Sequence, residues 1–179
     1  GISFWLATAI MLAATVFFFV ERSDVPAKWK TSLTVAGLVT GIAFWHYLYM
    51  RGVWIYAGET PTVFRYIDWL ITVPLQIIEF YLIIAAVTAI SSAVFWKLLI
   101  ASLVMLIGGF IGEAGLGDVV VWWIVGMIAW LYIIYEIFMG ETAKANAGSG
   151  NAASQQAFNT IKWIVTVCLL YTSPSPRDP

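Results

Sequence analysis

Residues 65–79 read RYIDWLITVPLQIIE and place ionisable side chains inside an otherwise apolar run. Apolar residues continue on both sides, so the segment from Val63 to Val87 is long enough to cross a bilayer as a helix, which needs roughly 20 residues. An ionisable group inside a span costs about 2.5–3.5 kcal/mol on insertion scales. A span that keeps Arg65, Asp68 and Glu79 therefore indicates a functional role for them.

The polar side chains of this segment share one face of the expected helix. With about 100° of rotation per residue and Asp68 set at zero, Glu79 lies at about 20° and Thr72 at about 40°. Arg65 lies at about 60° and Gln76 at about 80°. Asp68 and Glu79 are roughly 16 Å apart along the axis, which suits two stations on a proton path rather than two carboxyls that share one proton.

The composition of the whole chain is typical of a membrane protein. Of the 179 residues, 61% are hydrophobic and 11% are charged, whereas soluble domains carry about 25% charged residues. This excludes a soluble enzyme, and a net charge of -1 leaves no basic surface for nucleic acid. The chain has one cysteine, Cys168, so we expect neither an internal disulfide nor a cysteine-built metal site.

We predict an all-α integral membrane protein. Besides the quoted segment, apolar runs that fit complete spans lie at residues 2–20, 31–50, 94–111 and 119–139. Residues 51–62 are predicted to be a loop or a short hairpin, and residues 140–156 a flexible linker. A last apolar run, Ile161 to Tyr171, is too short to cross about 30 Å of hydrocarbon and looks like part of a sixth span.

Basic residues in the short loops predict the orientation in the membrane. Six of them follow spans one, three and five: Arg22, Lys28, Lys30, Lys97, Lys144 and Lys162. Arg51 lies on the opposite side. Because basic loops stay in the cytoplasm, we expect the N-terminus outside, Asp68 toward the outside and Glu79 toward the cytoplasm.

His46 lies near the outer end of the second span, at a depth comparable to that of Asp68 if the two helices pack antiparallel. The imidazole and the carboxylate can then meet, and the titration of Asp68 would depend on His46. Plainer alternatives stay open, because Arg65 and Asp68 can form a structural ion pair and His46 can be a packing residue. Glu136, near a span end, is expected to be solvated.

The segment from Arg65 to Gln76 closely resembles the third helix of the microbial rhodopsins, with its pattern R-Y-x-D-W-x-x-T-x-P. With Glu79 after Asp68 and with His46 in the second span, the resemblance is to the proteorhodopsin branch, whose members are bacterial light-driven proton pumps. The resemblance runs from about residue 2 to residue 167. It implies a seven-transmembrane-helix bundle, of which this chain holds helices one to five and part of helix six.

The resemblance also implies retinal, bound to a seventh-helix lysine as a protonated Schiff base. Asp68 would be the counterion and primary proton acceptor, Glu79 the cytoplasmic proton donor, and His46 and Arg65 would tune Asp68. Five residues would contact the retinal: Trp69, Thr72, Gln76, Met105 and Trp130. From their mid-span positions alone, Trp69, Met105 and Trp130 are equally compatible with an ordinary core.

A pump of this family is a multi-pass protein of the bacterial inner membrane, with lipid, retinal and protons as partners. It forms ring-shaped homo-oligomers, pentamers or hexamers, and it is a transporter rather than an enzyme. A carboxylic donor at position 79 favours a pump over a light sensor. Two alternatives stay open: a photosensory rhodopsin fragment, and a structural or transporter-subunit fragment whose polar face serves helix packing.

The two ends of the chain depart from the family pattern. Gly1 in place of Met predicts a start inside a longer reading frame, and the lysines all lie in loops or near span ends, where none could hold retinal. The prolines after residue 173 cannot continue a helix. We therefore expect a rhodopsin-like region at 1–167, a foreign or disordered tail at 168–179, and a truncated chain that does not pump.

Gln76 provides a spectral test, because glutamine replaces leucine in the blue-absorbing members. Excitation of retinal moves positive charge along the polyene, so a nearby amide dipole shifts the energy gap. Gln76→Leu in the complete protein should move the absorption maximum to the red, as measured by visible spectroscopy. An unchanged spectrum would exclude Gln76 from this role.

Overall fold

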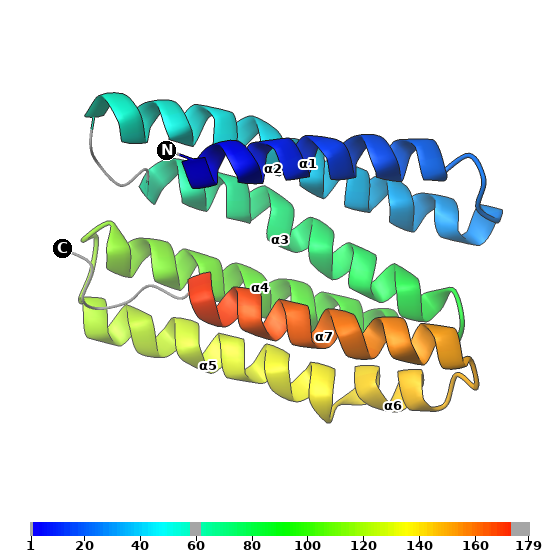
Figure 1. The fold of residues 1–179 in the computed structure, drawn as a ribbon. Coiled ribbons are helices and arrows are strands. Elements are labelled where there is room, and N and C mark those ends of the chain that lie inside the picture. The colour runs from blue at the N-terminus through cyan, green and yellow to red at the C-terminus, as the bar shows by residue number, and fades with distance from the viewer. Residues whose placement is uncertain (1, 58–61, 173–179) are drawn as a thin grey trace. The chain divides into compact units, whose positions relative to one another are not determined.

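A computed structural model describes residues 2–57 and 62–172 (Figure 1). Its helices are α1 (Ile2–Glu21), α2 (Ala27–Ala57), α3 (Thr62–Ala85), α4 (Ser92–Glu113), α5 (Val119–Phe138), α6 (Glu141–Ala147) and α7 (Ala152–Thr172). Within the described ranges there is no strand, as predicted. Helices α1 to α5 are each long and apolar enough to cross a membrane.

Helix α2 is longer than predicted at both ends. It begins at Ala27 and continues through residues 51–57, where we predicted a loop; the remainder of that predicted loop, at 58–61, lies outside the described residues. The Arg51 guanidinium lies 4.7 Å from the ring centroid of Trp5 on α1. This cation–π contact ties the C-terminal turns of α2 to a neighbouring helix, which the local sequence does not reveal.

The predicted flexible linker at 140–156 is also wrong, since it contains α6 and the start of α7. The sequence of α6, ETAKANA, is rich in alanine and carries Glu141 in its first turn and Lys144 in its last, an arrangement that complements the helix dipole. Asn151 caps α7, because its Oδ1 accepts the Ser154 N–H at 3.1 Å. Helix α7 continues through Thr172, and the rest of the predicted tail lies outside the described residues.

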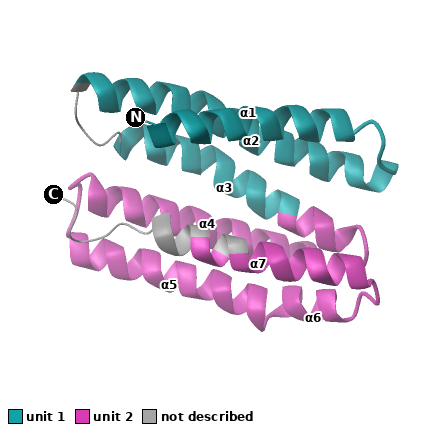
Figure 2. Ribbon diagram, viewed as in Figure 1, with its two compact units in different colours: residues 1–79 teal, residues 80–179 magenta. Residues whose placement is uncertain are grey.

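The chain divides into two compact units, residues 1–79 and 80–179, with the boundary inside α3 (Figure 2). In the first unit, α1 packs along α2 over Gly37 and Gly41, which lie one turn apart. A Cβ at Gly37 would meet the Phe19 ring at 2.9 Å. The Thr15 and Thr40 hydroxyls are hydrogen-bonded at 2.9 Å across the same interface. Small residues and hydroxyl pairs are the usual contacts between membrane helices.

In the second unit, α4 and α5 approach closely through glycines. A Cβ at Gly108 would lie 3.4 Å from the carbonyl oxygen of Trp122, and a Cβ at Gly126 would lie 3.5 Å from that of Met105. Gly108 and Gly112 form the G-x-x-x-G spacing typical of close helix pairs. Helix α7 packs into this unit through Phe158, whose ring centroid is 4.9 Å from that of Phe80.

The α4–α5 distance predicts a size limit at Gly126. One added carbon fits at ordinary van der Waals distance, so Gly126→Ala should leave the free energy of unfolding nearly unchanged. Gly126→Leu should lower it by about 1–3 kcal/mol, because the larger side chain forces the backbones apart. Unfolding in mixed micelles measures both variants, and equal stabilities would contradict the close packing of α4 and α5.

Candidate functional site

The polar face of α3 turns inward at two of its residues in the first unit. These are Asp68, which is 4% exposed, and Thr72, which is 5% exposed. The Thr72 hydroxyl donates to the Asp68 carbonyl oxygen at 2.9 Å, so the threonine needs no other partner. Helix α3 is continuous through Pro74, which has no N–H to donate to the carbonyl of Leu70.

The carboxylate of Asp68 faces His46 on α2. Its Oδ1 lies 3.2 Å from the imidazole Nδ1, and the two side chains are 6% and 16% exposed. The same Nδ1 lies 3.0 Å from the carbonyl oxygen of Ile42, one turn earlier in α2. Nδ1 meets the geometry of a hydrogen bond with the Ile42 oxygen. Asp68 Oδ1 has no hydrogen-bond partner within the described residues, so its contact with the imidazole is one of ion-pair distance. The two side chains therefore meet, as we predicted from their membrane depth.

Arg65 contacts an aromatic ring on its own helix. Its guanidinium carbon lies 5.4 Å from the ring centroid of Trp69, and Tyr66 packs edge-on against the same indole at 5.2 Å. The partner of the Asp68 carboxylate in the described structure is thus His46, which disfavours the alternative of an Arg65–Asp68 structural pair. Trp69 is fixed from two directions, as a wall of a ligand site would be.

Glu79 and Gln76 lie further along α3. Glu79 is half-buried, at the end of the first unit, and Gln76 is exposed. Three helical turns separate Glu79 from Asp68, so these two acids act as separate groups rather than as a dyad.

The remaining predicted retinal contacts lie in the second unit. Met105 on α4 and Trp130 on α5 are both half-buried. The indole Nε1 of Trp130 is buried and, within the described residues, has no hydrogen-bond partner. The contact of these two residues with retinal stays a prediction.

Three of the five lysines contact other side chains in the described structure. The Lys97 ammonium lies 3.5 Å from a Glu141 carboxylate oxygen, and the Lys162 ammonium lies 4.9 Å from the Phe138 ring centroid. Lys28 lies over the ring of Trp29 in the first turn of α2. Lys28 and Lys97 lie near the starts of their helices, as predicted, but Lys162 lies in the middle of α7 rather than in a loop or near a helix end.

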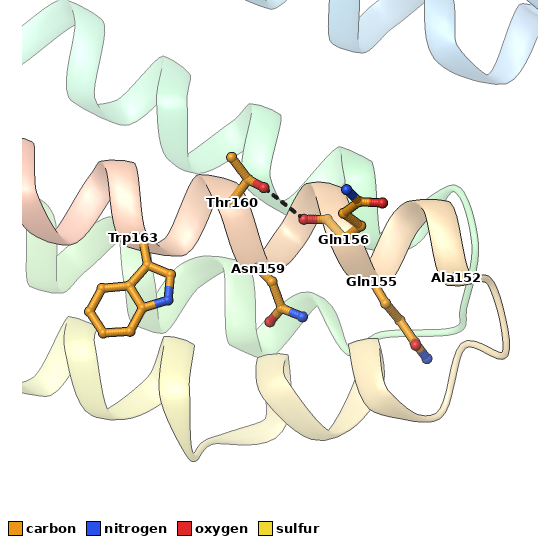
Figure 3. Close-up of a pocket in the computed structure, with 6 residues that line it drawn as sticks. All are labelled: Ala152, Gln155, Gln156, Asn159, Thr160 and Trp163. Carbon is orange, nitrogen blue, oxygen red and sulfur yellow. Dashed lines mark hydrogen bonds between the residues drawn. The ribbon is translucent and has the colours of Figure 1, made fainter.

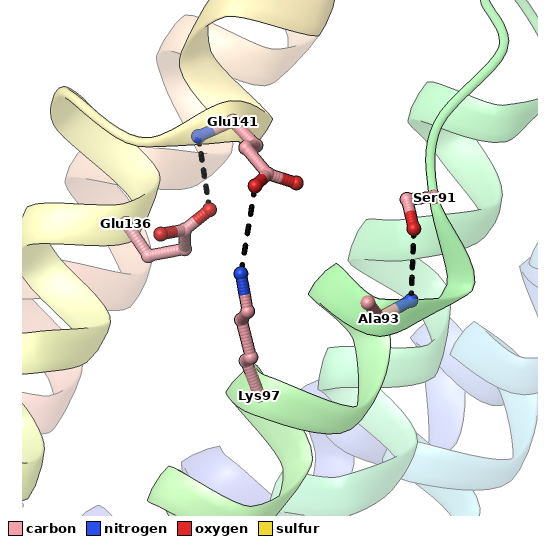
Figure 4. Close-up of polar contacts among 5 residues, drawn as sticks. All are labelled: Ser91, Ala93, Lys97, Glu136 and Glu141. Carbon is pink, nitrogen blue, oxygen red and sulfur yellow. Dashed lines mark hydrogen bonds and ion pairs between the residues drawn. The ribbon is translucent and has the colours of Figure 1, made fainter.

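Glu136 is the residue that sequence reasoning misjudged. It is 5% exposed rather than solvated, and its Oε1 accepts the Glu141 N–H at 2.9 Å (Figure 4). The sequence feature that could have indicated this burial is the position of Glu136, four residues before Gly140, where the chain leaves α5 and begins α6.

A hollow along α7 carries no ionisable group (Figure 3). It is lined by Ala152, Gln155, Gln156, Asn159, Thr160 and Trp163. The Thr160 hydroxyl is already bonded to the carbonyl of Gln156 at 3.0 Å. Among the lining side chains, none can bind and release a proton near neutral pH, so the hollow adds nothing to a proton path.

Comparison with known proteins identifies the family. The family model described as bacteriorhodopsin-like protein matches residues 1–171. The chain belongs to this family. As a bacteriorhodopsin-like chain with five candidate spans, it is a multi-pass membrane protein of the microbial rhodopsin type, and the predicted fold class is confirmed.

Its relatives include proteorhodopsins. The chain is 65% identical to the blue-light absorbing proteorhodopsin of Gamma-proteobacterium Hot 75m4, over 93% of this chain and 66% of that protein. It is 61% identical to the green-light absorbing proteorhodopsin of Gamma-proteobacterium EBAC31A08, over 92% and 66%. The crystal structure of blue light-absorbing proteorhodopsin from Med12 matches with a TM-score of 0.78 and 86% identity, over 93% of this chain and 74% of that one.

The chain thus spans 66% of the length of these curated relatives, just under two thirds. The identity to proteorhodopsins confirms the resemblance drawn from the third helix.

The His46–Asp68 contact predicts an energetic coupling. In a double-mutant cycle with His46→Ala and Asp68→Asn, the unfolding free energies should deviate from additivity by about 0.5–2 kcal/mol, since a contacting polar pair in a membrane protein couples on this scale. Unfolding in mixed micelles measures each variant.

The matched control pairs His46→Ala with Glu79→Gln. Because Glu79 lies roughly 16 Å further along α3 than Asp68, these effects should add within about 0.5 kcal/mol. Additivity in the His46–Asp68 cycle would mean that the short distance carries no interaction energy.

Proposed function

We propose that the full-length protein is a light-driven pump that carries protons outward across the bacterial inner membrane, with retinal as its chromophore. The observation that supports this most directly is the enclosed Asp68 carboxylate against His46, on the polar face of a membrane-spanning helix. An intramembrane carboxylate of this kind is costly and marks a proton or ion pathway. Membership in the bacteriorhodopsin-like family and identity to proteorhodopsins support the same function.

Asp68 is the proposed proton acceptor. Its side chain is almost completely removed from solvent, so it exchanges protons with groups inside the protein rather than with bulk water. His46 is the neighbouring group that can share a proton with it or stabilise its charge. Arg65, held over Trp69 one turn away, adds positive potential to this end of α3.

Glu79 is the proposed proton donor on the cytoplasmic side. It lies on the same helix and is more accessible than Asp68, as a group that is refilled with protons from water should be. Between the two acids, Pro74 leaves the Leu70 carbonyl without its usual helical donor. This oxygen and the Gln76 amide are polar groups between Asp68 and Glu79 to which water molecules can hydrogen-bond.

Retinal, when bound, would supply the light absorption and the light-dependent change in proton affinity that drives transport. Trp69, Thr72, Gln76, Met105 and Trp130 are the residues of this chain that would contact it. Trp69, which contacts Arg65 and Tyr66 one turn earlier on α3, and Trp130 would supply aromatic surface for it. We assign none of the lysines of this chain to retinal attachment, and we do not expect residues 1–179 alone to pump.

The proposal includes an orientation and an assembly. The basic residues that follow the spans α1, α3 and α5 support an N-terminus outside the cytoplasm. They lie in the connecting loops or in the helices after them: Arg22, Lys28, Lys30, Lys97, Lys144 and Lys162. Ring-shaped pentamers or hexamers are proposed for the full-length protein from its family membership.

Substitution of the two acids tests the pump. In the full-length protein in vesicles or cells, Asp68→Asn should abolish light-driven acidification of the medium, because an amide cannot accept the proton. Glu79→Gln should bind retinal normally but slow turnover, and a small permeant weak acid should restore the rate by delivering protons in place of Glu79.

The controls separate the alternatives. Thr8→Val, which removes a buried α1 hydroxyl already bonded to the Phe4 carbonyl at 2.7 Å, should keep acidification in the same direction. A photosensor predicts no acidification by the wild-type protein. A packing role predicts that Asp68→Asn lowers stability while pumping continues in the folded fraction, and this result would overturn the assignment of Asp68.

A further inference from the structure

Helix α6 is a seven-residue helix in the second unit that is attached at both ends by side chains from other helices. An isolated helix of this length is unstable in water, because nucleation costs more than so few hydrogen bonds return. The composition of this region predicts a flexible linker. The order of α6 therefore has to come from its attachments.

The first attachment joins α5 to the start of α6. The Glu141 N–H, which has no acceptor inside α6, donates to the Glu136 carboxylate at 2.9 Å (Figure 4). Gly140 makes this geometry possible, since a Cβ at that position would lie 2.4 Å from the carboxyl carbon of Glu136. The side chain of Glu136 thus takes the place of an N-cap residue, which Gly140 cannot supply.

The second attachment reaches α6 from α4. The Lys97 ammonium lies 3.5 Å from the Glu141 carboxylate, and both side chains are about half exposed (Figure 4). An exposed pair of this kind contributes little stability. Glu141 nevertheless joins two helices at one residue, through its backbone to α5 and through its side chain to α4.

The third attachment joins the end of α6 to α7. The Gln155 side-chain amide donates to the carbonyl oxygens of Asn146 and Ala147, at 3.3 and 3.1 Å. These are among the carbonyls that a helix C-terminus leaves without partners. Along the same short helix Thr142 is 0% exposed and Asn146 is 5% exposed, so one face of α6 is buried between its two attached ends.

We propose that α6 is a clamped strut, by which we mean a short rigid helix that is fixed at both ends by side chains of other helices. It moves as one body and transmits displacement of the first turn of α7 to α4 and α5. A flexible linker would let the two ends of α6 respond independently. A strut held by Glu136 at one end and by Gln155 at the other links them. The device belongs to the second unit alone and does not depend on the proposed pump.

Hydrogen exchange tests the first attachment, in the full chain reconstituted in lipid nanodiscs and followed residue by residue. In Glu136→Ala the Glu141 amide should exchange at least about tenfold faster, because it loses its acceptor. The matched control is Glu136→Gln, whose side-chain oxygen can still accept, and it should restore most of the protection. Equal exchange of the Glu141 amide in Glu136→Ala and Glu136→Gln would overturn the clamp.

Gln155→Ala distinguishes a strut from two local caps. If α6 is one body, loss of the Gln155 contacts should accelerate exchange at the Glu141 amide, at the opposite end of the helix, as well as in the last turn. A change confined to the last turn would overturn the strut. Exchange at Leu106 and Ile133, in the α4 and α5 core, reports global unfolding. If Glu136→Ala unfolds the unit, Gln155→Ala decides the question, since it leaves the buried carboxylate in place.

Discussion

The contact between the Asp68 carboxylate and the His46 imidazole is the interaction on which the functional interpretation depends. A charged or titratable group inside a bilayer is stable only where protein groups replace the water that it has lost. The His46 imidazole is the polar group that faces the Asp68 carboxylate from α2, at 3.2 Å, and the Thr72 hydroxyl is bonded to the backbone of the same turn. The first unit therefore positions one acid in a defined environment, with Glu79 three turns away in a more accessible one.

The helix pairs within each unit approach most closely at glycines. Lipid is as apolar as leucine, so membrane helices gain little from hydrophobic contact with each other and more from close backbone approach. Gly37 and Gly41 serve this purpose between α1 and α2, and Gly108 and Gly126 serve it between α4 and α5. Many large apolar side chains are exposed instead, as a lipid-facing surface requires.

The sequence predicted what depends on hydropathy and on helical periodicity. Five spans, the shared polar face of α3 and the meeting of His46 with Asp68 all follow from where polar residues interrupt apolar runs. It could not predict the C-terminal extension of α2 or the existence of α6. Those features depend on contacts between distant residues, Arg51 with Trp5 and Gln155 with Asn146, which no local pattern encodes. Glu136 was misjudged for the same reason, because its burial follows from the fold of the following turn.

The turn at Gly140 also constrains how this sequence can diverge. A side chain at that position would occupy the space of the Glu136 carboxyl group. The residues tolerated at position 140 therefore depend on the residue at position 136. Lineages that keep the glutamate should retain glycine, whereas those that lose it are free to accept alanine or serine there. The pair should accordingly appear as a correlated substitution when sequences of many such chains are aligned.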